Sequence, residues 1–462
     1  MKHSATKELV VSEQRATRGR NLRLSLATSL VARMSGVLLQ VITLPIAASS
    51  LGAADFTIYA MLGAFLAAMA LSNLGMGQAT TLRMAEAIGA GDNARAHDTL
   101  RVSLIIVGGI AFALALAAVG LILFTPIMTM VFANQLNGSV APNDAALFAC
   151  AVFFVTQVVS VFEAAQLAQQ RQYRLNLAMA VGTLLAAASV FWVSNHNPSV
   201  LSILIAVHLP VTVARIYNAI VVWVQFCSKY TSSAGPVKIR AGAIFKDGLH
   251  FVSGTTVSNF LTHHLSILIV GAFCESIVAA SFAAVMNSVL LATVVFNHIM
   301  APLRGALPEA KARGDGLWIR RVFINVTMMN SLVGFAIAFL FFIFGTAIFQ
   351  YWYGGSVVPW PELTRGAGVY ILVLTLEITF FGFVTALGYL RFASICMLAK
   401  GVAVSGVVFI LSSNVIVHGL MWVISAISFF ISMLPLAVFS WRLMRPECAW
   451  ENSWMGISRG AK

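Results

Sequence analysis

The chain has 462 residues, of which 59% are hydrophobic and only 10% are charged, and its mean hydropathy is +0.89. Soluble domains carry about 25% charged residues, so this chain has too few to cover a water-facing surface. The formal net charge of +13 would suit nucleic acid, but the basic residues lie beside apolar segments. That placement excludes a nucleic-acid partner and favours contact with the anionic inner leaflet of a membrane.

Twelve apolar segments follow one another along the chain, and each is close to the roughly 20 helical residues that cross a bilayer core. The outer connections between them are short, and none holds a soluble domain. The sequence therefore predicts an all-α membrane protein with twelve transmembrane helices. The predicted spans are 24–50, 54–78, 100–124, 145–168, 175–194, 200–226, 249–272, 277–300, 321–350, 364–389, 391–413 and 416–441.

Lys and Arg residues gather at both ends of the chain and in every second loop, and in the other loops only Arg365 breaks the pattern. Cytoplasmic loops collect basic residues because positive segments are not carried across the membrane. Both termini are therefore predicted to be cytoplasmic. The predicted parts are a basic tail at 1–23, a six-helix lobe at 24–227, a linker at 228–248, a second six-helix lobe at 249–441 and a tail at 442–462.

An internal repeat connects the two predicted lobes. Residues 86–92 and residues 309–315 both read E-A-x-x-x-G-D, 223 residues apart, and at this offset the first two spans overlay spans seven and eight. Six spans in each half give both halves the same orientation, so an axis along the membrane normal would relate them, as in known transporters. This plan predicts a cavity between the lobes and alternating access by rocking of one lobe against the other.

Two arginines and one carboxylate lie in the cytoplasmic half of the first lobe. Arg33, Glu163 and Arg215 fall at a similar depth when the direction of each span is considered. The planar guanidinium suits phosphate oxygens, so Arg33 and Arg215 are predicted to bind a phosphate-bearing head group, with Glu163 orienting one of them. Gln40, two turns beyond Arg33, is a supporting residue. The alternative is an ion pair of Glu163 with one arginine that only fixes helix packing.

Four more ionisable groups lie inside the second lobe. Glu377 and Lys400 are predicted to form a mutual structural pair. His263 and His264 are adjacent, so on a helix their side chains point about 100° apart and cannot hold one metal ion. One of them is a candidate for a proton-coupling group that lines the cavity, with packing as the alternative.

Motifs that are typical of soluble enzymes are absent from the sequence. It contains no G-x-x-x-x-G-K-[ST] phosphate loop and no H-E-x-x-H metal motif, so neither an enzyme nor a cofactor or metal site is predicted. The five cysteines show no C-x-x-C spacing, and we interpret them as small apolar packing residues. They are Cys150, Cys227, Cys274, Cys396 and Cys448.

The first two predicted spans carry a family resemblance. The run Ser50–Tyr59 (SLGAADFTIY) resembles the turn after the first span of bacterial polysaccharide flippases, and the run Leu71–Gly77 (LSNLGMG), with Arg83 after it, resembles the end of their second span. These proteins belong to the multidrug/oligosaccharidyl-lipid/polysaccharide (MOP) exporter superfamily, in its Wzx-like polysaccharide transporter branch. The sequence departs from the pattern at Asn73, where an acidic residue is common, and after Tyr59, where the usual glycine is missing.

The resemblance implies a MATE-like fold and a flippase of the bacterial inner membrane, which moves undecaprenyl-pyrophosphate-linked oligosaccharide from the inner to the outer leaflet for surface polysaccharide biosynthesis. The implied partners are this substrate, membrane lipids and the polysaccharide polymerase or glycosyltransferases of the same pathway. A cationic inner vestibule would receive the pyrophosphate while the lipid tail stays in the bilayer.

Three alternatives remain open. A multidrug cation antiporter of the same fold would place carboxylates in span one or in spans seven and eight, where this chain has Arg33 and no acidic residue. A flippase for the peptidoglycan lipid precursor usually has fourteen spans. A membrane-embedded glycosyltransferase or polymerase would need a large external loop or an acidic catalytic motif.

Overall fold

The computed structural model describes residues 2–71, 75–136, 142–229, 255–300, 303–312, 314–413 and 417–444, and all regular elements in these ranges are helices. The chain divides into two compact units, Met1–Val252 and Ser253–Lys462. Asn73, the tail beyond Met444 and all of the predicted linker except its first two residues lie outside the described ranges. Eleven of the described helices are long and apolar enough to cross a membrane, so the fold is that of a multi-pass membrane protein.

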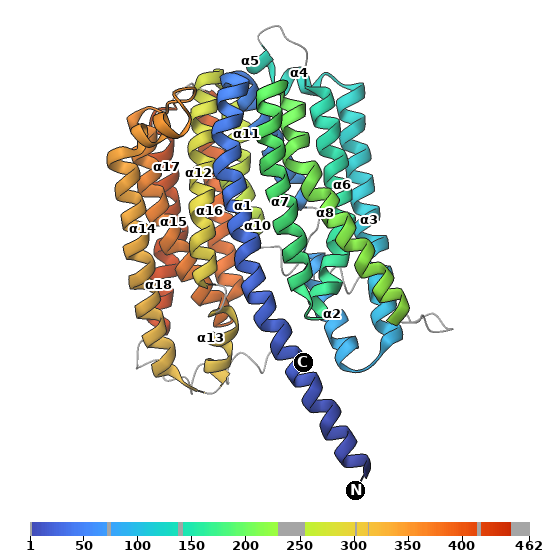
Figure 1. The fold of residues 1–462 in the computed structure, drawn as a ribbon. Helices are drawn as coiled ribbons and strands as arrows, with labels where there is room; N and C mark the ends of the chain where they lie inside the picture. Colours follow the sequence, from blue (N-terminus) through green and yellow to red (C-terminus); the bar gives the residue numbers. More distant parts are fainter. Residues whose placement is uncertain are drawn as a thin grey trace. The chain divides into compact units, whose positions relative to one another are not determined.

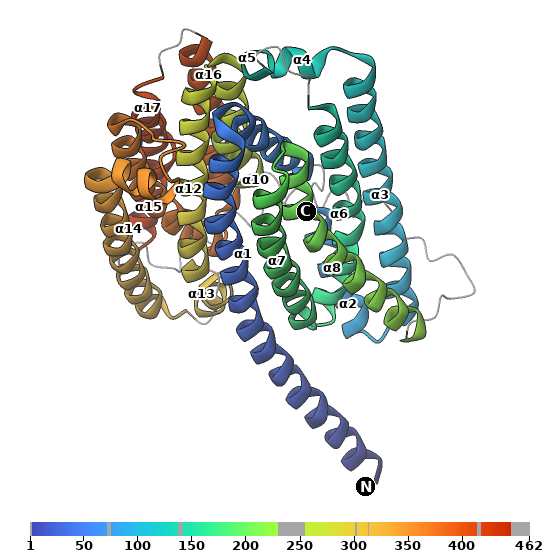
Figure 2. The ribbon, with the colours of Figure 1, turned by 45° about the horizontal axis from the view of Figure 1, so that its top comes forward.

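The first unit is a bundle in which α1 packs on α7, α7 packs on α8, and α3 packs on α6. Figures 1 and 2 both show α1, α7 and α8 side by side, with the start of α1 extending beyond the bundle. Its helices are α1 (Lys2–Ala70), α2 (Met76–Gly89), α3 (Asn93–Phe124), α4 (Ile127–Val131), α5 (Ala133–Leu136), α6 (Asn143–Ala168), α7 (Gln172–His196) and α8 (Val200–Lys229).

The second unit is built around α15, which packs on α14, α12 and α17 and is the most buried of its spans. Two of its spans contain a short π-helical segment between two α-helical segments. The elements are α10 (Thr255–Asn259), η2 (Phe260–His264), α11 (Leu265–Phe273), α12 (Ser276–Met300), α13 (Leu303–Ala312), α14 (Gly316–Trp352), α15 (Pro361–Ala386), α16 (Leu390–Ser413), α17 (Leu420–Ile427), η3 (Ser428–Met433) and α18 (Leu434–Leu443).

The first helix contains two predicted spans. Its apolar part, Ala27–Met69, has 43 residues, about 65 Å of helix against a bilayer core of about 30 Å. Gly52, with φ 75° and ψ 174°, breaks the helix, a conformation that glycine adopts without steric cost. Divided at this glycine, α1 supplies the first and second spans, and the described helices then give the twelve spans that the hydropathy pattern predicts.

The end of the second predicted span needs a correction. The prediction placed it at residue 78, but the helix ends at Ala70, and Gly75 (φ 68°) starts the separate helix α2. Apolar residues continue through this region because α2 packs on α3 and α6, so hydropathy alone does not show the break. The predicted loop between the second and third spans is therefore largely helical.

The sequence repeat has the same local structure in both units. Gly91 and Gly314 have φ of 73° and 74°, and the aspartate after each caps the next helix, α3 or α14. The capping hydrogen bonds are 2.9 Å from Arg95 N to Asp92 Oδ1 and 3.0 Å from Trp318 N to Asp315 Oδ1. The glycine permits the left-handed turn that ends one helix, and the carboxylate accepts from a free N–H at the start of the next.

Glycines let neighbouring helices approach closely inside each unit. A Cβ added at Gly182 of α7 would lie 2.9 Å from Ala214 Cβ of α8, and one added at Gly345 of α14 would lie 2.6 Å from Thr364 Cβ of α15. Such distances are shorter than real carbon contacts, so only glycine fits. Small residues at helix contacts are typical of membrane bundles, where dispersion contacts replace a hydrophobic driving force.

Candidate functional site

An ion pair joins α6 and α8 in the first unit. Arg215 Nε donates to Glu163 Oε1 at 2.6 Å and Nη2 donates to Oε2 at 3.0 Å, and each side chain is 18% exposed. Both oxygens of the carboxylate therefore bind one planar guanidinium, which is the strongest geometry for this pair of groups. Of the two arginines predicted near Glu163, the structure shows this contact for Arg215.

A second polar pair lies one turn along the same two helices. Gln166 and Asn218, each three residues beyond a member of the ion pair, exchange two amide hydrogen bonds of 3.1 and 3.0 Å. Residues three apart share a helix face, so the ion pair and the amide pair form two successive polar contacts between α6 and α8. Arg215 is thus partly exposed and also holds α6 and α8 together.

Arg33 and Gln40 lie on α1, and both are exposed. They are seven residues apart, which is two turns, so they share a face of this helix. Ser35 lies on another face, where its hydroxyl accepts a 2.8 Å hydrogen bond from Thr183 of α7. Since Arg33 is about 200° around the helix from Ser35, its side chain leaves α1 on the side away from α7.

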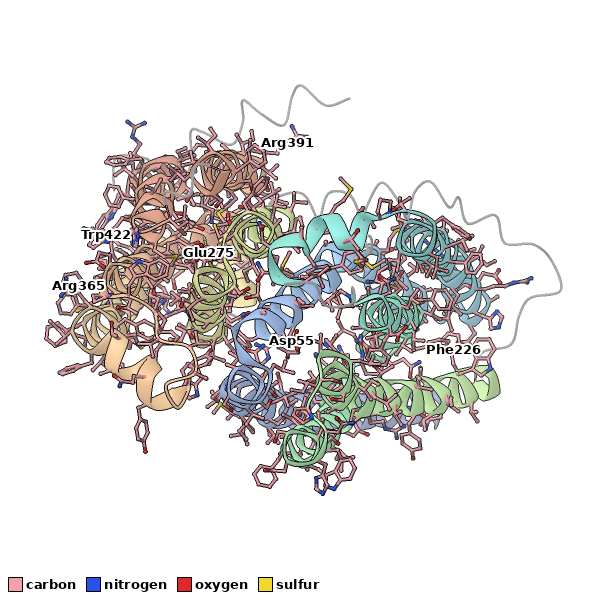
Figure 3. The ribbon with its side chains drawn as sticks, turned by 90° about the horizontal axis from the view of Figure 1, so that it is seen from above. Asp55, Phe226, Glu275, Arg365, Arg391 and Trp422 are labelled. Carbon is pink, nitrogen blue, oxygen red and sulfur yellow. The ribbon has the colours of Figure 1, made fainter. Side chains whose placement is uncertain are left out.

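Two other charged residues lie near the ends of spans. Asp55 follows the break at Gly52 by three residues and is exposed (Figure 3). Arg365, the one basic residue predicted at an outer mouth, lies at the edge of the second unit, with its guanidinium carbon 6.0 Å from the centre of the Phe342 ring (Figure 3).

The second unit contains a fully buried charged cluster. Lys400 Nζ of α16 lies 2.6 Å from Glu377 Oε1 of α15, and both side chains are 0% exposed. The other carboxylate oxygen, Oε2, accepts a hydrogen bond from the Ser432 hydroxyl of η3. The pair predicted from sequence is thus present, and Ser432 completes the set of groups that bind the carboxylate.

A buried histidine, His263, lies in the same unit. The Asn259 carbonyl can only accept, so the 3.1 Å contact with His263 Nδ1 places the hydrogen on Nδ1. The other nitrogen, Nε2, lies 3.0 Å from the Tyr370 hydroxyl. His264 points elsewhere and stacks on Phe260. Among the described residues no group of three or more His, Cys, Asp and Glu side chains could hold a metal ion.

A cavity of about 70 Å³ adjoins this buried cluster, and it has room for a few water molecules. Glu377 and His263 both line it, so the ion pair and the histidine belong to one polar region. The remaining lining residues are Asn259, Leu290, Thr293, Asn297, Leu374, Ile378, Phe381 and Met397.

Two π-helical segments bring groups to this region. His263 lies in η2, and Ser432 lies in η3; both segments pack on α16, which carries Lys400. Segments of this kind are rare and occur often at functional sites. Sequence reasoning did not select Tyr370 or Ser432. Both residues meet their partners across helices that are distant in the chain, so no local spacing pointed to them.

No protein-family model matches the sequence, and no characterised protein sequence matches it either. Solved structures do match. An inward-facing multidrug resistance MATE family transporter of the MOP superfamily aligns with a TM-score of 0.68 and 15% identity, over 91% of this chain and 98% of its own. A mutant of the Vibrio cholerae MATE transporter VcmN gives 0.63 and 14%, over 95% and 98%. These likenesses show that the chain has the MATE/MOP fold.

A third solved structure is a MOP superfamily transporter from Pyrococcus furiosus. It aligns with a TM-score of 0.60 and 14% identity, over 93% of this chain and 97% of its own. That protein is described as having a binding pocket of reversed polarity, which suggests a different function for it.

Proposed function

We propose that this chain is a transporter that flips lipid-linked oligosaccharide, carried on undecaprenyl pyrophosphate, from the inner to the outer leaflet of a bacterial inner membrane. Both termini would be cytoplasmic, and the two six-helix units would rock to give alternating access. Arg33 and Arg215 would meet the pyrophosphate at the cytoplasmic side, and Gln40 would add a polar contact to the head group.

The observation that carries this proposal is that each carboxylate deep in the described spans is bound by a cation of the chain itself. Glu163 is held by both arms of Arg215, and Glu377 is held by Lys400. A cationic drug needs a carboxylate that can accept it, because a buried charge requires a partner of opposite sign. Neither of these carboxylates offers an open oxygen pair to such a ligand.

The charged residues predicted in the inner halves of the first lobe favour an anionic ligand. They are Arg33, Arg215 and Glu163, so their formal charges sum to +1. Charged groups within a membrane usually face a cavity or partner and mark substrate paths. Two guanidinium groups are suited to the several oxygens of a pyrophosphate, which a single lysine would bind less specifically.

The Pyrococcus furiosus neighbour gives indirect support. Its description connects the polarity of the pocket with a change of function inside this fold, so charge is a reasonable guide to substrate class here. By this guide a net positive vestibule favours an anionic substrate over the cations that multidrug antiporters carry.

The test is translocation of a fluorescent oligosaccharide lipid pyrophosphate in proteoliposomes that contain only this protein. We expect transport by the wild type, loss of about ten-fold or more in Arg33→Ala, since charge-assisted contacts contribute about 1.5–3 kcal/mol, and partial recovery in Arg33→Lys. Arg365→Ala, which removes an arginine at the rim of the second unit, is the matched control and should transport normally.

Absence of lipid movement combined with efflux of an organic cation under a pH gradient would reject the flippase and assign the chain to the cation-antiporter function. Normal transport by Arg33→Ala would remove Arg33 from the head-group site. Flipping of the peptidoglycan precursor in place of the oligosaccharide lipid would keep the anionic head group and change the substrate.

A further inference from the structure

Glu377 is one of only three acidic residues that lie inside the predicted spans by sequence, with Glu163 and the rim residue Asp55. We propose that Lys400 is a tethered cation: its ammonium group occupies a site beside Glu377 that would otherwise bind a small monovalent cation such as Na⁺. Because the cation is part of the chain, transport needs no exchangeable coupling ion and is driven by the membrane potential. The claim about transport rests on the proposed function, whereas the claim about the site does not.

The burial of Glu377 means that its carboxylate always requires a positive partner. With 0% exposure it receives no help from solvent, and an ionised carboxylate in such a place is costly unless it is paired. The ammonium at 2.6 Å from Oε1 supplies that charge, and the Ser432 hydroxyl supplies a hydrogen bond to Oε2. A metal ion in the same place would meet repulsion from Lys400.

The surrounding groups are those that a small hard cation prefers, which are oxygen ligands. The cavity that Glu377 lines also contains the side chains of Asn259, Thr293 and Asn297. Asn297 Nδ2 donates to the Thr293 carbonyl at 3.0 Å, which leaves the amide oxygen of Asn297 as a possible ligand. Loss of the lysine side chain would therefore leave a carboxylate, a hydroxyl and amide oxygens around the vacated position and the adjoining cavity.

The titratable groups around Glu377 do not supply an alternative cation in the observed state. His263 lines the same cavity, but its Nδ1 contacts the Asn259 carbonyl and its Nε2 contacts the Tyr370 hydroxyl, so both ring nitrogens are engaged by groups other than Glu377. Tyr370 lies two turns before Glu377 on α15. Lys400 is thus the charged partner that the cluster contains.

The consequence for transport is an uncompensated movement of charge. With Glu163 and Glu377 both neutralised by fixed cations, an anionic substrate crosses without a counter-ion on these groups. An inside-negative potential favours outward movement of an anion by about 50-fold per elementary charge for each 100 mV. Transport should therefore respond to the potential and remain unchanged by sodium or proton gradients.

The experiment compares the thermal unfolding of detergent-purified protein in sodium chloride and in choline chloride of equal ionic strength. Lys400→Ala opens the site, and Lys400→Asn opens it with an added amide oxygen. We expect a melting temperature that rises in sodium for these two variants and that does not change with the salt for the wild type. In Glu377→Gln/Lys400→Met, which removes both charges, sodium should again have no effect.

Folded Lys400→Ala and Lys400→Asn proteins that are indifferent to sodium would overturn the proposal, since Lys400 would then only fix helix packing. Failure of both variants to fold in either salt would also overturn it, because the site then cannot accept a mobile cation. Folding in sodium but not in choline would support it.

The transport assay separates this proposal from the proposed function. Lipid movement by the wild type that follows a potassium–valinomycin potential, and not an imposed sodium or pH gradient, would support transport without a coupling ion. Dependence on either gradient would overturn that claim. A sodium effect on the melting temperature of the variants without any lipid movement would reject the flippase and leave the tethered cation intact.

Discussion

Removal of Arg215 should destabilise the first unit through the carboxylate that it leaves behind. Loss of one partner of a buried ion pair costs about 3–5 kcal/mol, and the 18% exposure of both side chains permits some hydration of the remaining charge. We therefore expect Arg215→Ala to lower the free energy of unfolding by about 2–3 kcal/mol, with a similar loss for Glu163→Ala.

The double variant distinguishes the pair from its members. In Glu163→Ala/Arg215→Ala no charge is left unpaired, so the loss should be smaller than the sum of the single losses by about 2 kcal/mol. The assay is unfolding by sodium dodecyl sulfate in mixed micelles, measured for the four proteins of the cycle. The matched control is the cycle for Gln166 and Asn218 on the same two helices, whose neutral hydrogen bonds should give a coupling of about 1 kcal/mol.

A coupling energy below about 0.5 kcal/mol for Glu163 and Arg215 would refute this reasoning, because the bidentate contact would then contribute no more than an exposed surface pair. The double variant also tests the head-group site. It lacks the arginine but contains no unpaired charge, so a folded double variant that flips lipid normally would show that Arg215 serves packing alone.

Three further predictions concern stability, each measured by the same unfolding assay. Gln170, the only described residue other than glycine with a positive φ (57°), should gain about 0.5–1 kcal/mol on replacement by glycine; no gain would contradict the assigned turn. Gly345→Ala should cost about 1–3 kcal/mol because its Cβ would clash with the Cβ and hydroxyl of Thr364, and a second change, Thr364→Gly, which removes both atoms, should restore part of it. Asp92→Ala and Asp315→Ala should each cost about 1 kcal/mol through a lost cap, with asparagine as the tolerated control; unequal losses would show that the repeat differs in its energetics.

The features that were predictable from sequence are those that depend on residues close together in the chain. The length of an apolar run gives a span because the bilayer has one thickness, and the Gly–Asp spacing of the repeat gives a turn and a cap because φ and hydrogen bonding are local. The end of the second span at Ala70 was missed because apolar residues continue into α2, which is buried by packing and not by lipid.

Which side chains meet in the site depends on how each helix is rotated about its axis. Contacts between distant parts of the chain set that rotation. Either Arg33 or Arg215 was a possible partner for Glu163, and only the facing of α6 and α8 selects Arg215. Ser432 was not recognised because a π-helical segment shifts the helix face, so the usual spacing rules do not show that it meets Glu377. Both cases require the relative placement of helices that are distant in the chain.

The two units carry their charged pairs at different positions, which supports assigning different roles to the two units. The turn at Gln170 closes with a 3.0 Å hydrogen bond from Arg171 N to Gln166 O, and the turn at Gly388 closes in the same way from Tyr389 N to Val384 O, also at 3.0 Å. The two turns end α6 and α15, the fourth span of each unit, so we align the units at these turns.

Glu163 lies seven residues before Gln170, and the residue seven before Gly388 in the second unit is Phe381. Glu377 lies eleven residues before the second turn, where the first unit has Val159. If the pairs served only to hold a repeated fold together, a shared position would be expected, since equivalent helices have equivalent faces. Instead one pair is partly exposed and the other fully buried beside a cavity. This asymmetry is what a division between substrate contact in the first unit and charge compensation in the second requires.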